Sequence, residues 1–212
     1  PYVSDEHKKE AHSIAESYFD LACSYTNSTP ALFITSGLSG CGKSTVAHEL
    51  AKRLGLVVLS SDVTRKKLAH ISTKEHRFDS IESGIYSPEF SRKTYDALFS
   101  EAEKVLKDGA SVIIDATFIK SAERITAKKL AEQTGAKFYI IECKLDEETT
   151  HSRLEKRMNE HTPSDGRWEI YLAQKNSIEP VSEIPASNHI IIDTEKSTED
   201  NVNILLDRLG YI

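Results

Sequence analysis

The chain has 212 residues, of which 39% are hydrophobic and 28% charged, and its net charge at pH 7 is −6. This composition is typical of a soluble globular domain with a short extension. The negative charge argues against a broad surface that follows a nucleic-acid backbone, and no apolar run approaches the length needed to cross a membrane. The three scattered cysteines, Cys23, Cys41 and Cys143, favour a reducing cytoplasm over a disulfide framework or a zinc site.

Residues 1–29 are predicted to form an N-terminal helix and linker, and residues 30–212 the main domain. An apolar stripe at helical spacing covers residues 5–25, and the polar segment Thr26–Pro30 follows it. The stripe consists of Ala11, Ile14, Ala15, Tyr18, Phe19 and Ala22. The next run, Ala31–Thr35, is apolar and β-prone, as expected for a buried strand.

The segment Gly37–Thr45 matches the phosphate-loop (Walker A) pattern G-x-x-x-x-G-K-[ST] at every fixed position. Glycines let the chain curl so that successive N–H groups converge on phosphate oxygens, and the positive end of the next helix faces the same anion. Lys43 supplies a charge for the outer phosphates, and Ser44 a hydroxyl for Mg²⁺. The residues predicted to bind ATP are Gly37, Ser39, Gly40, Cys41, Gly42, Lys43, Ser44 and Thr45. The alternative is a Gly-Ser turn before an ordinary helix, whose apolar periodicity ends at Gly55.

A second predicted strand, Val57–Ser60, leads into Asp62 and Arg65. An aspartate at this place can accept the proton of an attacking hydroxyl, and an arginine on the adjacent helical face can hold an anion of the acceptor. The alternative interpretation makes Asp62 the N-cap of a short helix and Arg65 a solvated side chain.

The stretch from His70 to Ser87 has no clear period, and a loop of this length in a compact domain is usually functional or mobile. Ser87 and Pro88 then have the character of a helix cap and a first-turn proline. They predict a long helix that ends at Gly109.

Asp115 lies near the end of the apolar strand Ser111–Phe118, where a carboxylate can hold Mg²⁺, here through a water molecule. Many ATPases place a glutamate directly after this aspartate to activate water, but Ala116 follows here. This favours transfer to a bound acceptor over hydrolysis. The residues predicted to contact the acceptor are Asp62, Arg65 and Thr117. The alternative role of Asp115 is that of a strand-end cap.

Further helices and strands alternate along the rest of the chain. Helices are predicted over residues 121–134, 146–157, 167–179 and 197–209, and strands over Lys137–Cys143 and His189–Asp193. Strands that alternate with helices form parallel β-α units, so we expect an α/β fold with an open sheet and helices on both faces. In such sheets ligands bind beyond the carboxyl ends of the strands, which is where the candidate residues gather.

Arg153 and Arg157 lie four residues apart on one face of the predicted helix 146–157, and no acid lies at helical spacing from Arg153. Two like charges at this spacing repel each other, so a bound polyphosphate would satisfy both. The alternative is a pair of solvated arginines that match the negative end of the helix.

Together these motifs resemble the P-loop kinases of the polynucleotide-kinase and zeta-toxin neighbourhood, and most closely the ATP-binding domain fused behind aminoglycoside-phosphotransferase-like domains. The resemblance covers about residues 30–195 and rests on Gly37–Thr45, Ser61-Asp62-x-x-Arg65, Tyr86–Glu89, Val112–Phe118 and Arg153-x-x-x-Arg157. It implies a three-layer P-loop fold with five parallel strands in the order 2-3-1-4-5, a helical lid, ATP and Mg²⁺. It also implies that Asp62 is the base, that Arg65 binds the acceptor and that Arg153 and Arg157 close on the phosphates. Residues 1–29 would then be the tail of an upstream domain.

The leading functional hypothesis is a cytoplasmic kinase that moves the γ-phosphoryl group of ATP to a hydroxyl. Its catalytic residues would be Lys43, Asp62, Arg153 and Arg157. The acceptor is a small molecule or a nucleic-acid end, although the net charge does not favour nucleic acid. The alternative is an ATP-binding or ATP-hydrolysing regulatory module of a larger protein. The chain lacks the Asn-Lys-x-Asp segment with which GTPases read guanine, and also the signature segment of transporter ATPases.

Overall fold

The computed structural model describes residues 29–72, 83–157 and 167–211. The predicted helix over residues 5–25 lies outside these ranges, as does the middle of the stretch from His70 to Ser87. The boundary between an N-terminal extension and the main domain at residues 29 and 30 therefore stays a prediction.

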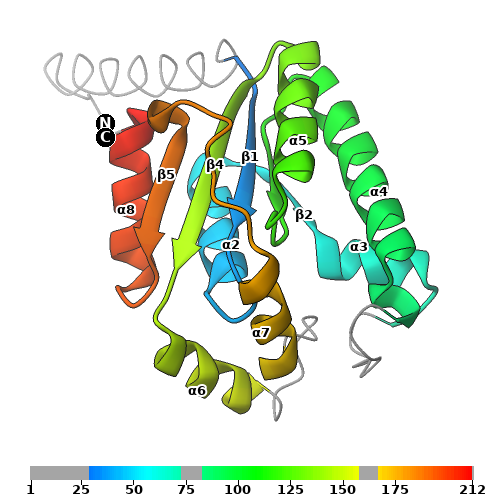
Figure 1. Ribbon diagram of the computed structural model, residues 1–212. Coiled ribbons are helices and arrows are strands. Elements are labelled where there is room, and N and C mark those ends of the chain that lie inside the picture. Colours follow the sequence, from blue (N-terminus) through cyan, green and yellow to red (C-terminus); the bar gives the residue numbers. More distant parts are fainter. Residues whose placement is uncertain (1–28, 73–82, 158–166, 212) are drawn as a thin grey trace, which may run out of the picture.

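A parallel sheet of five strands forms the centre of the molecule (Figure 1). The strands are β1 (Ala31–Ser36), β2 (Val57–Ser60), β3 (Val112–Asp115), β4 (Lys137–Lys144) and β5 (His189–Asp193). Their order is β2-β3-β1-β4-β5, and every neighbouring pair is parallel. The expected α/β fold and the strand order 2-3-1-4-5 are thus confirmed.

Helices cover both faces of the sheet. The helices are α2 (Lys43–Leu54), α3 (Ser61–Leu68), α4 (Pro88–Lys107), α5 (Ser121–Thr134), α6 (Glu147–Arg157), α7 (Trp168–Ser177) and α8 (Thr198–Leu209), and two short 3₁₀ turns are η1 (Gly84–Tyr86) and η2 (Ala186–Asn188). Helices α2 and α8 pack on one face, and α4 and α5 on the other, while α6 and α7 lie beyond the carboxyl ends of the strands (Figure 1). In the described ranges, no helix combines the length and the apolar character required to cross a membrane.

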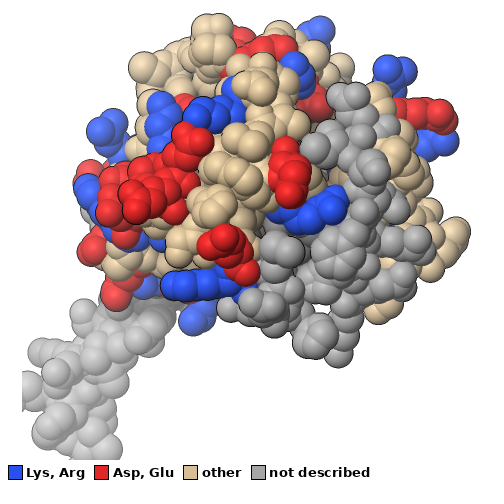
Figure 2. Space-filling view, turned by 60° about the horizontal axis from the view of Figure 1, so that its bottom comes forward, with Lys and Arg blue, Asp and Glu red and all other residues tan. Residues whose placement is uncertain are grey.

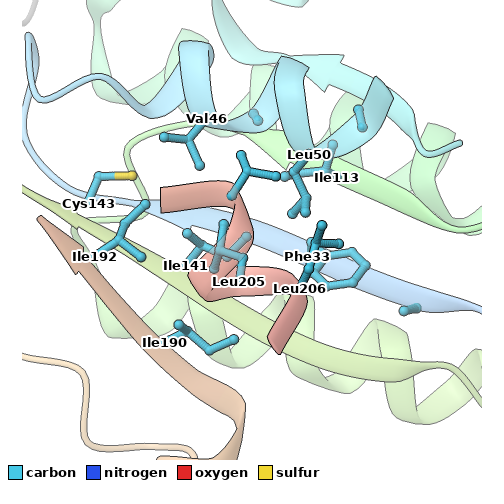
Figure 3. Packing of buried hydrophobic residues seen from close by; sticks show 14 of the residues in the cluster. Phe33, Val46, Leu50, Ile113, Ile141, Cys143, Ile190, Ile192, Leu205 and Leu206 are labelled. Atoms are coloured by element: carbon cyan, nitrogen blue, oxygen red, sulfur yellow. The ribbon is translucent and has the colours of Figure 1, made fainter. Parts of the chain in front are cut away.

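The central strands are buried on both faces, so alternate side chains enter opposite layers. Phe33 packs in the layer of α2 and α8 with Leu50 and Leu205 (Figure 3). Its neighbours Leu32 and Ile34 belong to the layer of α4 and α5. This two-sided burial fixes the sheet firmly and leaves its carboxyl edge as the place where polar groups can collect.

The predicted helix starts are confirmed. Ser87 Oγ accepts a hydrogen bond from Phe90 N at 3.3 Å, Asp146 Oδ1 accepts one from Thr149 N at 2.8 Å, and Ser197 Oγ accepts one from the backbone at 3.1 Å. Each cap satisfies a backbone N–H group that a helix leaves without an internal partner.

Strand β3 is shorter than the predicted run Ser111–Phe118, because the Thr35 side chain captures the next peptide. The Thr35 hydroxyl donates to Ala116 O at 2.8 Å and accepts from Ala116 N at 3.1 Å. The chain therefore leaves the sheet directly after Asp115 and passes through a left-handed conformation at Phe118, with φ of 41°. This early exit turns the polar end of the strand toward the loop after β1.

One buried arginine fastens the segment after α7 to the rest of the fold. Arg124, on α5, is fully buried. Its Nη1 donates to Phe118 O at 2.8 Å, its Nη2 donates to Pro180 O at 3.0 Å, and its Nε donates to the Glu183 carboxylate. A buried charge is tolerated only when it is paired and hydrogen-bonded in this way.

We predict that Arg124→Ala lowers the free energy of unfolding by about 3–5 kcal/mol, because it removes the buried cation from the Glu183 carboxylate and its hydrogen bonds to Phe118 O and Pro180 O. Urea unfolding followed by circular dichroism at pH 7 measures the loss. The exposed Arg208→Ala should change it by less than about 1 kcal/mol. A double variant, Arg124→Met with Glu183→Leu, should regain much of the stability. A small loss in Arg124→Ala would mean that Glu183 is solvated without its partner.

Candidate functional site

The loop Gly37–Thr45 joins β1 to α2 and has the backbone conformation that its glycines predict. Gly37, Gly40 and Gly42 have φ values of 136°, 85° and 84°, in the region that side chains disfavour. Two of these glycines also have no room for a side chain. A Cβ on Gly37 would lie 2.5 Å from Cys143 O, and one on Gly40 would lie 2.9 Å from Leu154 Cγ. The loop is therefore pressed against the end of β4 and against α6.

Hydrogen bonds at both ends hold the phosphate loop at the carboxyl edge of the sheet. Gly37 N donates to Thr117 O at 3.0 Å, which ties the loop to the segment after β3. On the other side, the Thr194 hydroxyl lies 2.8 Å from Cys41 O and 3.0 Å from Lys144 O. These contacts fix Gly37 and Cys41 at the carboxyl edge of the sheet.

The side chains of Lys43 and Gln174 form hydrogen bonds with backbone groups of the loop. Lys43, the first residue of α2, is 8% exposed, and its Nζ donates to Leu38 O at 2.7 Å. Gln174, on α7, places Oε1 2.7 Å from Ser39 N. The amide oxygen of Gln174 thus stands where a phosphate oxygen would accept the same N–H hydrogen bond.

A pocket of about 250 Å³ opens beside the loop and brings together most of the predicted residues. Lys43, Ser44, Asp62, Arg65, Asp115 and Thr117 all line it. Asp115 is 5% exposed and lies at the end of β3, and Asp62 lies in the first turn of α3. The pocket therefore combines a phosphate-binding loop with two carboxylates, the arrangement expected for metal-assisted phosphoryl transfer.

The N-cap of α3 is Ser60, and Asp62 is not the cap. Ser60 has extended φ and ψ, and its Oγ accepts from Val63 N at 3.5 Å. Asp62 follows two residues later and lines the pocket. Ser60 therefore takes the N-cap role that the sequence left open for Asp62.

Arg65 is not a solvated side chain. It is 8% exposed, and its Nη1 donates to Ile85 O at 2.6 Å and to Ser91 Oγ at 3.2 Å. The guanidinium lies over the Tyr86 ring, with Cζ 5.0 Å from the ring centroid, a cation–π contact. These contacts orient Arg65 at the wall of the pocket opposite the loop.

Glu123, Tyr95 and Lys120 also line this wall, and the sequence patterns did not single them out. Burial raises the pKa of the Glu123 carboxyl, against the lowering effects of a hydrogen bond from Tyr95 and of nearby cations. Burial and the charge of Glu123 in turn raise the pKa of the Tyr95 hydroxyl. In the sequence, Glu123 has only the signal of an acid in the first turn of a helix, which normally matches the helix dipole.

Arg153 lies on the other side of the phosphate loop, in a second pocket of about 360 Å³. Its Nη2 donates to Thr194 O at 2.9 Å, and its Nη1 lies 3.5 Å from the position of a Cβ on Gly42. Thr45 and the first turn of α8 line the same pocket. Arg157 is the last residue of α6, and its side chain lies outside the described part of the structure. A role for both arginines in closing on the phosphates stays a prediction.

Helix α7 is joined to both α6 and α5 around the loop. His151 and Trp168 meet edge to face at 4.4 Å between ring centroids, and Lys175 pairs with Glu147. Just after α7, the Glu179 carboxylate accepts a hydrogen bond from Ser121 N at 2.8 Å and a second one from the Ser121 hydroxyl. These two hydrogen bonds lower the pKa of Glu179 to about 2. Trp168 therefore helps to hold α7 against α6.

Residues 32–181 match the family described as an AAA domain, and the chain belongs to this family. It is 28% identical over 151 residues to an uncharacterized protein of Mycobacterium tuberculosis. That match covers 71% of this chain but only 30% of the relative's length. The chain therefore spans under a third of that curated relative.

Solved structures of kinases share the fold. A sugar kinase from Janibacter sp. superposes with a TM-score of 0.61 at 19% identity, over 86% of this chain and 95% of that chain. The APS kinase of Mycobacterium tuberculosis, solved in complex with AMPPNP and APS, gives a TM-score of 0.58 at 19% identity, over 86% of this chain and 98% of that chain. The fold is thus that of the P-loop NTPases. The finer resemblance to zeta-toxin relatives and fused proteins stays a prediction.

We predict that Gln174→Ala tightens ATP binding, because the amide of Gln174 competes with a phosphate oxygen for Ser39 N–H. One neutral hydrogen bond is worth about 0.5–1.5 kcal/mol, so the Kd for Mg²⁺-ATP should fall about 2–10-fold. Isothermal titration calorimetry measures the change, with the exposed Asn176→Ala on the same helix as the control. Weaker binding would show instead that Gln174 contacts the bound nucleotide.

Proposed function

We propose that the protein is a kinase that transfers the γ-phosphoryl group of ATP to a hydroxyl of a small acceptor. The observation that carries this proposal is that Lys43, Asp115 and Asp62, from three separate segments, line one pocket. The phosphate loop and α2 would bind the phosphates, and the opposite wall would bind the acceptor.

The donor set of the pocket fits Mg²⁺. Ser44 offers a hydroxyl and Asp115 a buried carboxylate, and Mg²⁺ prefers one or two such oxygens together with phosphate oxygens and water. When bound, the metal would neutralise charge on the phosphates. Lys43 would do the same from the loop, after its ammonium leaves the carbonyl of Leu38.

Asp62 would serve as the base. Its carboxylate takes the proton of the acceptor hydroxyl while the hydroxyl oxygen bonds to the γ-phosphorus. The bond between that phosphorus and the oxygen that bridges to the β-phosphate breaks, and ADP leaves with this oxygen. Arg65, held by Ile85 O and the Tyr86 ring, would orient the acceptor.

The second pocket suits the nucleoside part of ATP. A nucleotide held by its phosphates at Gly37–Ser44 leaves the loop near Gly42 and Thr45, and both residues line this pocket. Arg153 lies beside Gly42 there and can cover a base or contact the α-phosphate.

Two features favour a small acceptor over a nucleic-acid end. The pocket that holds Asp62 has a volume of about 250 Å³, part of which the outer phosphates would fill. The described part of the face that carries α6 and α7 also mixes acidic and basic side chains and shows no continuous basic track (Figure 2).

Release of ADP with and without acceptors tests the proposal. A kinase releases ADP only when an acceptor is present, whereas acceptor-free turnover indicates an ATPase, and binding without turnover indicates a regulatory module. Lys43→Ala should abolish turnover, because the charge that stabilises the transferring phosphoryl group is lost. Its circular dichroism and unfolding midpoint should match those of the wild type. Unchanged turnover in this variant would contradict the proposal.

We predict that Asp62→Asn lowers transfer to the acceptor by about 10²–10⁴-fold, because the amide cannot take up a proton. ATP affinity and thermal stability should stay at wild-type values, since Ser60 caps α3. Labelled ATP and a titration of ATP binding separate the two effects. Full transfer activity in Asp62→Asn would rule out its role as the base.

A further inference from the structure

The second pocket, which contains Arg153, has a basic lining. Arg153, Lys156 and Lys196 all line this space of about 360 Å³, and every other described residue that lines it is uncharged. The first turns of α2 and α8 reach the pocket at Thr45 and Thr198, and the positive ends of these helices add to its potential. The whole chain has a net charge of −6, so this gathering of cations is a local feature.

The three cations of the pocket have few partners within the protein. Arg153 Nη2 donates to Thr194 O at 2.9 Å, and this acceptor is a neutral carbonyl. Lys156 and Lys196 are exposed, and neither forms an ion pair with another residue in the described ranges. The two ammonium groups are therefore available to an anionic ligand.

The acidic residues that neighbour these cations in the sequence lie outside the pocket lining. Glu155, Glu195 and Glu199 are exposed, and none of them lines the pocket. Asp200, in the first turn of α8, accepts a hydrogen bond from the Ser197 hydroxyl at 2.7 Å and also lies outside the lining. Within the pocket itself, the three cations therefore set the sign of the potential.

ATP alone does not account for three cations at this place. Under the proposed function, the outer phosphates bind beside Lys43 in the first pocket, so only the α-phosphate and the nucleoside would reach the second. Arg153, whose Nη1 lies near Gly42, can pair with the α-phosphate. Ribose and adenine are uncharged and offer Lys156 and Lys196 no anion. The two lysines therefore point to a further anionic group on the nucleoside part of a ligand.

We propose that the second pocket accepts a nucleotide that carries a phosphate on its ribose in addition to its 5′ phosphates. The 5′ phosphates bind at the loop, the ribose lies beside Thr45, and the ribose phosphate pairs with Lys156 and Lys196. A nucleotide of this kind without a γ-phosphoryl group competes with ATP and inhibits transfer. The inference rests on the proposed kinase function and adds a class of regulatory ligand to its nucleotide site.

Matched nucleotides test for recognition of the ribose phosphate. AMP and adenosine 3′,5′-bisphosphate differ by this phosphate alone, and adenosine 2′,5′-bisphosphate carries it on the neighbouring hydroxyl. Competition against labelled ATP measures the Kd of each compound. At least one bisphosphate should bind about 10-fold more tightly than AMP, since its added phosphate meets two ammonium groups. Equal affinity for AMP and both bisphosphates would overturn the inference and leave the kinase function intact.

Variants that remove a charge assign the preference to the two lysines. The ratio of the Kd for AMP to that for the bisphosphate should fall about threefold in Lys156→Gln and in Lys196→Gln, and to about one in the double variant. A general loss of folding or nucleotide binding cancels in this ratio. The control Lys137→Gln, exposed at the start of β4, should keep the wild-type ratio. A double variant that keeps the wild-type ratio would overturn the inference.

Salt provides an independent measurement on the wild-type protein. Raising the ionic strength from about 0.05 M to about 0.5 M screens exposed charges, so the same ratio should fall toward one. A ratio that does not respond to salt would contradict pairing with exposed lysines. No binding of any nucleotide would overturn both the inference and the proposed function. Acceptor-independent release of ADP, together with the expected ratio, would contradict the kinase function alone.

Discussion

The phosphate loop keeps its curled backbone because the surrounding elements hold it in place. It fits closely against the segment after β3, the end of β4 and α6. Gly37 lies so near Cys143 O that a side chain has no room there, and Thr194 ties down Cys41 O from the opposite side. The buried sheet supplies the rigid base for these contacts, and the two pockets take their positions from the loop between them.

The parts of the structure that follow from local pattern were accessible from the sequence. Each strand of the sheet is a short apolar run, and a segment whose apolar residues recur at helical spacing follows it. This alternation of strands and helices predicted a parallel sheet with helices on both faces. Lys43 was found from the phosphate-loop pattern, Asp62 from its place just after the second strand, and Asp115 from its place at the end of an apolar strand. The carboxyl edge of a parallel sheet then brings them to one pocket.

The residues that were missed depend on contacts between distant segments. Gln174 and Ser39 are 135 positions apart in the sequence, and nothing in the composition of α7 predicts their contact. Glu123 has the appearance of an ordinary first-turn acid, and its burial beside Tyr95 follows from the packing of α4 on α5. Arg153 illustrates the same limit, because helical spacing fixed its face of α6 but not the pocket toward which that face turns.

The division of the site by the phosphate loop has a consequence for how such a protein can diverge. In the proposed function, the nucleotide would bind to the loop, α6 and the segment after β5, whereas the acceptor would bind to α3, η1, α4 and α5. Under this proposal, substitutions at Glu123 or Arg65 would alter which compound is recognised without disturbing the contact between Thr194 and the loop. The acceptor would then be free to differ among relatives that keep one and the same phosphate donor.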